Sequence, residues 1–373
     1  YTITMLLSPF NYNRRITSEV TIGNITIGGT APIRVQSMAN TDTNHVEASV
    51  AQAIRIKEAG GELVRFTTQG IREAQSMKLI HEQLRARGVN VPLVADIHFN
   101  PKVAEEAAQY IEKVRINPGN FVAGKTTDYT DEEFAAERNK IHEKLRTLIS
   151  ICKQHHTAIR IGVNHGSLSP RIMNRYGDTP EGLAASCMEF LELCQLENFH
   201  QIVISVKASN TLVMVQAVRL LVQKMDAAGF HYPLHLGVTE AGEGEDGRIK
   251  SAIGIGGLLL DGIGDTIRVS LSEEPEAEIP VARLLVSYIG ERAEAAAIQA
   301  VESTKYSRYE YIRRTTHAVG NIGGENVPVV FADKDGGFST IPDYLLVDNH
   351  VLSTNGDTYP VFEADYIQTL LSD

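Results

Sequence analysis

Cationic side chains recur near the ends of successive strand-like runs in this sequence. The runs ELVRF, KVRINPGN, AIRIGVN and DTIRVSL each contain an arginine, and VISVKAS contains a lysine. Such cations, gathered at one place, would repel one another and lose hydration, so the pattern predicts an anionic ligand. The planar fork of arginine favours bidentate phosphate binding, which points to a phosphorylated or diphosphate-bearing small molecule. The five cations are Arg65, Arg115, Arg160, Lys207 and Arg268.

Other polar side chains share a strand face with these cations. Residues i and i+2 of a strand point to the same side, and the opposite parity of these runs is apolar. A single arginine near a strand end is often a salt-bridged rim residue, but five on different strands favour a shared site. Arg34 lies early in its strand and is left out of the site. The companions on the polar face are Asp96, His98, Asn117, Asn164 and Ser270.

Some of these residues have types suited to acid–base chemistry. Asp96 is a candidate for proton transfer, or else an anchor for a neighbouring arginine. His98 belongs either to the site or to the hydrogen-bonded core. Glu240 ends the seventh strand-like run beside a glycine-rich loop. Its carboxyl group is predicted to face the substrate, as a proton donor or as an anchor for a hydroxyl group.

The elements that must position these residues alternate regularly. Strand-like runs lie near residues 32, 62, 92, 113, 158, 201, 233 and 265, and amphipathic helical stretches separate them. This alternation over residues 30–300 predicts an α/β fold, a (β/α)₈ TIM barrel, whose usual size is about 250 residues. An open doubly wound sheet is the alternative, but it ordinarily has fewer strands. Barrel enzymes carry their active sites at the C-terminal ends of the strands, where these cations lie.

The segments on either side of the barrel follow other patterns. VTIGNITIGG, residues 20–29, predicts a β-hairpin that covers the N-terminal end of the barrel. From about Tyr306 the chain becomes strand-like and rich in turns. We therefore predict a barrel domain over residues 1–300 and the beginning of a second, truncated α/β domain over residues 301–373. Residues 1–4, which precede Met5, are expected not to be native.

Composition excludes several classes of function. The net charge is −11, from 46 acidic and 35 basic residues, which argues against a nucleic-acid-binding or membrane-surface protein. No apolar run reaches the length of a membrane span, and a cytoplasmic protein is expected. Cys152, Cys187 and Cys194 form neither a CxxC pair nor a disulfide pattern, and we interpret them as core residues. No metal-binding spacing is present, so no metal ligand is predicted.

Several motifs in the barrel segment resemble one known family. Between about Arg15 and Leu271 the chain is similar to 4-hydroxy-3-methylbut-2-enyl diphosphate synthases of the methylerythritol phosphate pathway of isoprenoid biosynthesis. The later segment, with YEYIRRTT and ADKDGGFS, resembles the insert domain of the long form of this family. The motifs of the barrel segment are VQSMANTDT, ELVRFTTQG, LVADIHF, VRINPGN, IRIGVNHGSL, SVKAS, LHLGVTEAG and KSAIGIGGLLLDGIGDTIRVSL.

The resemblance implies an oxidoreductase that opens and dehydrates 2-C-methyl-D-erythritol 2,4-cyclodiphosphate reductively. Asp96 and Glu240 would take catalytic roles. The implied substrate-binding residues are Arg65, His98, Arg115, Asn117, Arg160, Asn164, Lys207, Arg268 and Ser270.

The resemblance also implies a cofactor that this chain does not hold. In this family a [4Fe-4S] cluster is bound by three cysteines and a glutamate of a C-terminal domain, and these ligands have no counterpart here. The chain is therefore expected to be an N-terminal piece that binds the diphosphate, binds no cluster and is inactive alone. Ferredoxin or flavodoxin is the implied electron donor, and a homodimer is possible in this family. A pterin-binding barrel such as dihydropteroate synthase is the alternative, and a non-catalytic phosphate-sensing module is a further one.

Overall fold

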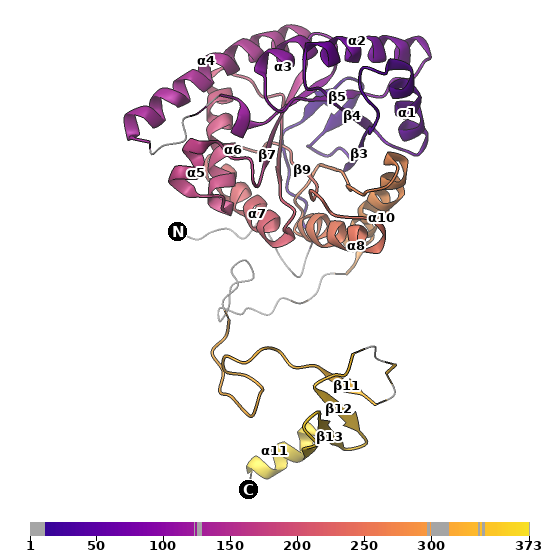
Figure 1. Cartoon of the computed structure of the whole chain (residues 1–373), viewed down its shortest axis with the longest axis vertical. Helices are drawn as coiled ribbons and strands as arrows, with labels where there is room; N and C mark the ends of the chain where they lie inside the picture. The colour runs from indigo at the N-terminus through magenta and orange to yellow at the C-terminus, as the bar shows by residue number, and fades with distance from the viewer. Residues whose placement is uncertain are drawn as a thin grey trace. The chain divides into compact units, whose positions relative to one another are not determined.

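The chain divides into two compact units, Tyr1–Val301 and Glu302–Asp373. The computed structural model describes residues 12–372 apart from 123, 125–128, 297–298, 300–312, 335 and 338–339. Residues 1–4 lie outside the described residues, and so do residues 306–312, where the second segment was predicted to begin. Figure 1 shows the first unit as strands surrounded by helices.

The first unit is a closed parallel barrel, as the alternation predicted. Its eight strands follow the order β8-β7-β6-β5-β4-β3-β10-β9. A parallel bridge between Ile204 and Leu234 joins β8 to β9 and closes the ring, which excludes the open doubly wound sheet. The strands are β3 (Arg34–Met38), β4 (Leu63–Thr67), β5 (Leu93–Asp96), β6 (Lys113–Ile116), β7 (Ala158–Asn164), β8 (Ile202–Lys207), β9 (His235–Leu236) and β10 (Thr266–Ile267).

Helices connect the strands, and some of them begin with a side-chain N-cap followed by proline. The Asn100 side chain accepts a hydrogen bond from the Lys102 amide, and Thr179 caps its helix through the Gly182 amide. No helix in the described residues is long and apolar enough to cross a membrane. The helices are α1 (Val46–Glu58), α2 (Ile71–Ala86), α3 (Pro101–Ala107), η1 (Pro118–Asn120), α4 (Asp131–His155), α5 (Pro170–Tyr176), α6 (Pro180–Leu196), α7 (Thr211–Ala227), α8 (Gly244–Ser251), η2 (Ala252–Gly256), α9 (Gly257–Leu260) and α10 (Pro275–Glu294).

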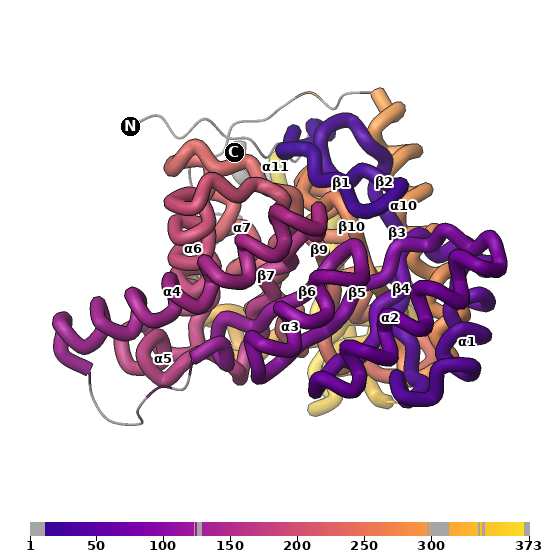
Figure 2. The backbone as a smooth tube through the Cα atoms, turned by 90° about the horizontal axis from the view of Figure 1, so that it is seen from above, coloured from indigo at the N-terminus to yellow at the C-terminus, as the bar shows by residue number. Residues whose placement is uncertain are grey.

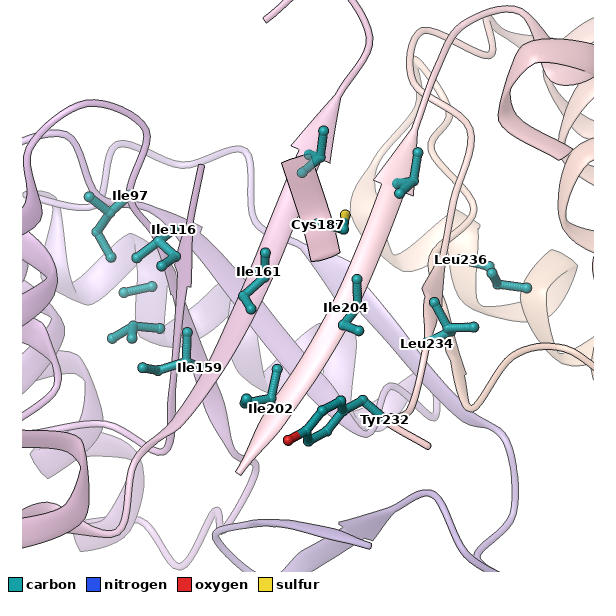
Figure 3. Close-up of a cluster of buried hydrophobic side chains, with 14 of the residues drawn as sticks. Ile97, Ile116, Ile159, Ile161, Cys187, Ile202, Ile204, Tyr232, Leu234 and Leu236 are labelled. Atoms are coloured by element: carbon teal, nitrogen blue, oxygen red, sulfur yellow. The ribbon is translucent and has the colours of Figure 1, made fainter. Parts of the chain in front are cut away.

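The outward faces of the strands form the main hydrophobic core. Ile159, Ile161 and Ile204 point from β7 and β8 toward the helices and are fully buried (Figure 3). All three cysteines are buried in this layer, as interpreted from the sequence. Burial, with a smaller contribution from Glu197, raises the pKa of Cys194 to about 12, so this thiol stays protonated near neutral pH. Because the apolar residues of each strand face the helices, the polar residues that alternate with them face the barrel interior.

A β-hairpin closes the end of the barrel at which the strands begin, called its lower end below. Strands β1 (Val20–Ile22) and β2 (Ile25–Ile27) pair in antiparallel register (Figure 2). The buried side chains Val20, Ile22 and Ile27 pack against four residues from the N-terminal halves of the barrel strands. Those four residues are Leu63, Val94, Ala158 and Val203. The hairpin thus seals this end with apolar surface, as the sequence predicted.

The second unit contains a small mixed sheet. Strands β11 (Phe331–Asp333) and β12 (Tyr344–Val347) are parallel, and β13 (His350–Ser353) and β14 (Thr358–Pro360) continue the sheet in antiparallel register. Tyr344 stacks on Phe331 with ring centroids 4.6 Å apart. Many apolar side chains of this unit are nevertheless exposed, among them Val327 at 78% and Ile341 at 79%. The helix α11 (Ala364–Ser372) follows the sheet.

Truncation of the hairpin core should destabilise the barrel. Replacing Ile22 by Ala leaves a cavity against the barrel bottom and should lower the free energy of unfolding by about 2–5 kcal/mol. Urea unfolding followed by circular dichroism measures the change. The neighbouring Thr21 is exposed, and Thr21→Ala should change stability by less than about 0.5 kcal/mol. Equal stabilities for the two variants would mean that the hairpin does not seal the barrel.

Candidate functional site

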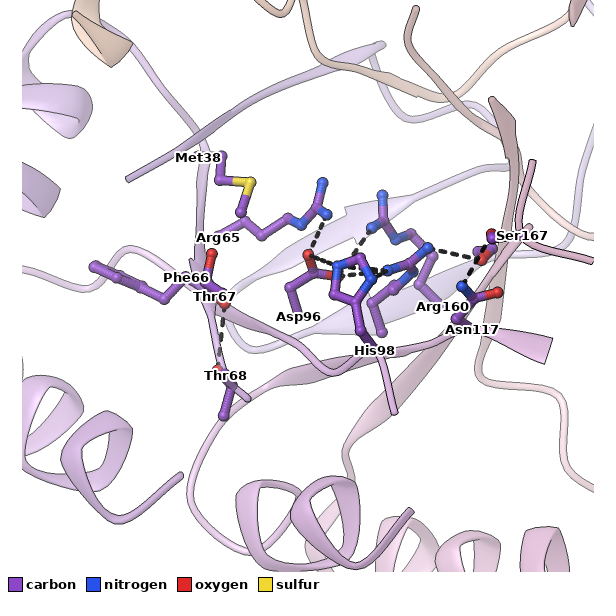
Figure 4. A network of polar contacts seen from close by, with 12 residues as sticks. Met38, Arg65, Phe66, Thr67, Thr68, Asp96, His98, Asn117, Arg160 and Ser167 are labelled. Atoms are coloured by element: carbon purple, nitrogen blue, oxygen red, sulfur yellow. Dashed lines mark hydrogen bonds and ion pairs between the residues drawn. The ribbon is translucent and has the colours of Figure 1, made fainter. Parts of the chain in front are cut away.

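A single buried carboxylate organises the mouth of the barrel. Asp96 ends β5 and is fully buried. One of its oxygens accepts a hydrogen bond from Arg115 Nη1 at 3.1 Å and lies 3.9 Å from Arg160 Nη2. The other oxygen contacts Arg65 Nη2 and lies 2.9 Å from His98 Nε2 (Figure 4). The structure therefore supports the interpretation of Asp96 as an anchor for arginines, and it brings four predicted residues around one carboxylate.

The electrostatics of this cluster keep Asp96 ionised. Burial alone would raise the pKa of the Asp96 carboxyl group, but Arg65, Arg115 and the His98 hydrogen bond outweigh it and hold the pKa well below its ordinary value. Such a carboxylate is a weak base near neutral pH. The geometry therefore favours positioning of cations over proton transfer as the role of Asp96.

His98 is tied into the same network. Its Nε2 lies 2.9 Å from Asp96 and 3.0 Å from Arg115 Nη1, and its Nδ1 lies 3.3 Å from the same Arg115 atom. His98 therefore contacts both the carboxylate and one guanidinium group of the cluster. The His98 side chain remains about one third exposed, at 32%, so it also borders the open side of the mouth.

The cation on the opposite side has its own buried carboxylate. Arg268 follows β10 and contacts both oxygens of Glu278 at 3.0 and 3.1 Å. Glu278 lies on α10, is 2% exposed, and also accepts hydrogen bonds from Ser37 Oγ at 2.7 Å and the Leu271 amide at 3.2 Å. The sequence analysis missed Glu278, because helical periodicity does not reveal that one buried position on a helix carries a charge.

The remaining cations of the mouth are less well compensated. Within the described residues, Asp96 and Glu278 are the carboxylates that form ion pairs with four of the five cations, and no ion pair of Lys207 is among them. Burial lowers the pKa of Lys207 well below its ordinary value, and Arg160 and Arg65 lower it further by repulsion. The Nε and Nη1 atoms of Arg160 are buried without a hydrogen-bond partner among the described residues. Unused buried donors of this kind favour an acceptor-rich ligand.

Two glycines make room for these cations. A Cβ atom at Gly162 on β7 would lie 2.4 Å from Arg115 Nε, and one at Gly237 after β9 would lie 2.6 Å from Lys207 Nζ. The Gly162 carbonyl also accepts a hydrogen bond from Arg115 Nη2 at 2.9 Å. The glycines therefore let long cationic side chains lie across the barrel interior.

Asn117 has a structural role that parity did not predict. Its side-chain oxygen accepts a hydrogen bond from the Gly119 amide at 3.1 Å, and its Nδ2 donates to Ser167 Oγ at 3.2 Å. A Cβ atom at Gly119 would lie 1.7 Å from the Ser167 carbonyl oxygen, so only glycine fits this turn. Asn117 thus links the ends of β6 and β7, and its 2% exposure leaves little surface for a ligand.

The other predicted residues lie at the mouth by position. Asn164 is the last residue of β7 and is paired in register with Lys207, and Ser270 lies two residues beyond Arg268. Glu240 is exposed after β9 and adopts a left-handed backbone conformation with φ of 52°. Non-glycine residues rarely adopt this conformation, and such strain clusters at functional sites. The conformation is consistent with a ligand-facing Glu240.

Deeper in the barrel lie polar residues that the sequence analysis did not select. Lys113 begins β6, His235 begins β9, and Gln36 lies within β3; all three are buried. Lys113 shares strand parity with Arg115, and that was the available signal. A lysine at the start of a strand was not considered because active sites lie at strand ends.

A groove on the outer helices offers a contrasting arrangement of charge. It has a volume of about 560 Å³ and is bordered by α4, α5, α6 and α7. Its charged residues are paired: Arg138 contacts Glu192 at 3.0 Å, and Lys224 contacts Glu181 at 2.8 Å. The charges of this groove are balanced, unlike those of the barrel mouth.

The described residues do not fit an iron–sulfur cluster. They contain no group of three or more His, Cys, Asp or Glu side chains able to hold a metal ion. The three cysteines are buried within the helix layer, where burial raises their pKa values and disfavours the thiolate that a cluster requires.

The fold and the mouth define a TIM-barrel protein with a cationic strand-end site. Residues 17–283 match the family described as "GcpE TIM-barrel domain". The chain belongs to this family.

Curated relatives carry one name. A Bacteroides fragilis protein named 4-hydroxy-3-methylbut-2-en-1-yl diphosphate synthase (flavodoxin) is 57% identical over 95% of this chain and 60% of its own length. A Phocaeicola vulgatus protein of the same name is 61% identical over 90% of this chain and 55% of its own length. The chain thus spans about 60% of the length of such relatives.

One solved structure shows a distant similarity in fold. A Xanthomonas albilineans dihydropteroate synthase with 4-aminobenzoic acid is 13% identical, with a TM-score of 0.49, over 74% of this chain and 99% of that one. A similarity at this level carries no argument about function.

Neutralising Asp96 should destabilise the barrel strongly. Asp96→Asn leaves Arg65 and Arg115 without a buried counter-charge and should lower the free energy of unfolding by about 3–5 kcal/mol. The folded-state pKa of Asp96 is depressed, so this contribution is fully present above the unfolded pKa of about 3.9 and is lost as the pH falls through the lower folded value.

Urea unfolding between pH 3 and pH 8 measures the difference between the two proteins. The control is Asp131→Asn, because Asp131 pairs with Arg175 at the surface and is 90% exposed. An Asp96→Asn variant as stable as the control near neutral pH would contradict the role of Asp96 as the organising charge.

Proposed function

We propose that this chain supplies the substrate-binding barrel of a 4-hydroxy-3-methylbut-2-enyl diphosphate synthase. Its ligand would be 2-C-methyl-D-erythritol 2,4-cyclodiphosphate, which the complete enzyme opens and dehydrates reductively. The observation that carries the proposal is the excess of buried cations over carboxylates at the strand ends. Family membership and the names of the curated relatives, which are synthases of this diphosphate product, support the proposal.

The arginines would bind the diphosphate through pairs of hydrogen bonds, and Lys207 would bind it as a single positive charge. The buried Nε and Nη1 donors of Arg160 have no partner among the described residues and suit phosphate oxygens. Burial, followed by repulsion from Arg160 and Arg65, lowers the pKa of Lys207, and a bound phosphate would offset the repulsion and favour the charged lysine. Arg65 and Arg115 are already oriented by Asp96, so little side-chain order would be lost on binding. His98, Asn164, Arg268 and Ser270 would complete the pocket.

The carboxylates would have different roles in this site. Asp96 stays ionised and holds arginines, and we now propose it as a positioning residue. Glu240 is exposed on a strained loop, which suits a group that contacts the sugar-derived part of the ligand. It would donate a proton or bind a hydroxyl group. Asn117 would act through the turn that it stabilises.

The redox partners belong to the proposal as well. A [4Fe-4S] cluster would supply electrons from a part of the enzyme other than the described residues, and flavodoxin would be the donor, as in the names of the relatives. The second unit would begin the insert domain of the long form, and the rest of that domain would cover its exposed apolar side chains. A cytoplasmic location and a homodimer stay predictions of the sequence.

Binding of the cyclodiphosphate should depend on the cations at the mouth. Arg160→Ala or Arg115→Ala removes a charge-assisted hydrogen bond, and the affinity should fall about tenfold to a hundredfold. Isothermal titration calorimetry with the purified chain measures this, after circular dichroism confirms that the variants fold. The chain alone should form no product when a reductant is added.

The control is Arg138→Ala, because Arg138 forms a surface ion pair with Glu192 and should not affect binding. Unchanged affinity in both barrel variants would overturn the proposed site. Tighter binding of a pterin diphosphate would favour the alternative of a dihydropteroate synthase. Product formation by the chain alone would contradict the assignment of the redox chemistry to another part of the enzyme.

A further inference from the structure

The barrel interior below the mouth is polar, which is unusual for the centre of this fold. Barrel interiors are ordinarily filled by layers of branched apolar residues, four to a layer from alternate strands. Strands β4, β6, β8 and β10 contribute Leu63, Lys113, Val203 and Thr266 to one layer. The layer directly above it, on β3, β5, β7 and β9, contains Gln36, Val94, Arg160 and His235.

Lys113 lies in the lower of these two layers. It is fully buried, and its Nζ atom has no hydrogen-bond partner among the described residues. Its register neighbours on the flanking strands are Val94 and Ala158, which are apolar. The hairpin residues below pack against these same two neighbours. Lys113 is therefore enclosed from below, and the charge that could balance it must come from above.

The charged groups around Lys113 are cations. Burial lowers the pKa of Lys113 well below its ordinary value, and repulsion by Arg160 and Arg65 lowers it further. His235 is affected in the same way, by burial and then by Lys207, Arg160 and Lys113. Arginine cannot release its proton in this setting, but lysine and histidine can. Apart from Lys113 itself, Arg160 and His235, the side chains of the two layers and the buried hairpin residues are uncharged, and Arg34, one layer lower on β3, is paired with Glu62 at 2.8 Å.

We propose that Lys113 is an additional member of the anion site, neutral in the free protein and protonated when a diphosphate occupies the mouth above it. This inference rests on the proposed function. Arg160 connects diphosphate binding with the protonation of Lys113. Its positive charge repels Lys113, and its donors without a partner suit phosphate oxygens. A phosphate paired with Arg160 would offset the repulsion that adds to burial in disfavouring the charged form of Lys113. The buffer acid supplies the proton and its conjugate base stays in solution, one N–H bond forms at Nζ, and no redox step occurs.

The proposal predicts a proton balance that depends on Lys113. Titration of inorganic pyrophosphate and of the cyclodiphosphate, in two buffers of different ionisation enthalpy at pH 7.5, gives the protons taken up on binding. The wild-type chain should take up about one proton more than Lys113→Met, because the variant cannot titrate at this position. The ligand's own protonation is common to both proteins and cancels in the difference. The affinity of the wild-type chain should also weaken more steeply as the pH rises.

Two further variants make the result decisive. Lys113→Gln keeps a polar side chain without a titrating group and should match Lys113→Met, so one misfolded variant does not end the test. Lys140→Gln removes an exposed lysine and should match the wild type. Normal binding with equal proton uptake in all four proteins would overturn the role of Lys113 and leave the proposed function standing. Failure of the wild-type chain to bind either ligand would overturn both.

Discussion

The contact between Asp96 and the arginines around it is the interaction on which the barrel mouth depends. A carboxylate fully removed from water is stable only when cations and hydrogen bonds replace its hydration, and Arg65, Arg115 and His98 do so. The same contacts fix guanidinium groups that would otherwise be mobile. One ionised residue therefore orients several cations toward the strand ends.

The rest of the barrel is arranged to tolerate this charge. Gly162 and Gly237 leave space for long side chains, and Glu278 neutralises Arg268 from the last helix of the unit. The hairpin seals the opposite end with Val20, Ile22 and Ile27. Solvent and ligand therefore reach the cations through the mouth. The apolar residues of the strands pack against the helices.

The remaining imbalance connects structure to function. Arginine stays charged when it is buried, whereas Lys113, Lys207 and His235 lose affinity for protons in the same environment. A doubly phosphorylated ligand would be the counter-charge that this interior lacks. Stability of the free protein and affinity for an anion are then opposed, because each added carboxylate would strengthen the first and weaken the second.

The sequence by itself determined the eight strands, their order with the helices, the hairpin and the parity that turns Arg65, Arg115 and Arg160 inward. These features follow from local periodicity, which each segment carries in its own residues. Only the tertiary structure decided that Asp96 anchors arginines, that Glu278 reaches Arg268, that Asn117 serves a turn and that Lys113 lies buried without a partner. Those outcomes depend on which residues of distant segments meet inside the closed barrel, and no local pattern in the chain encodes that meeting.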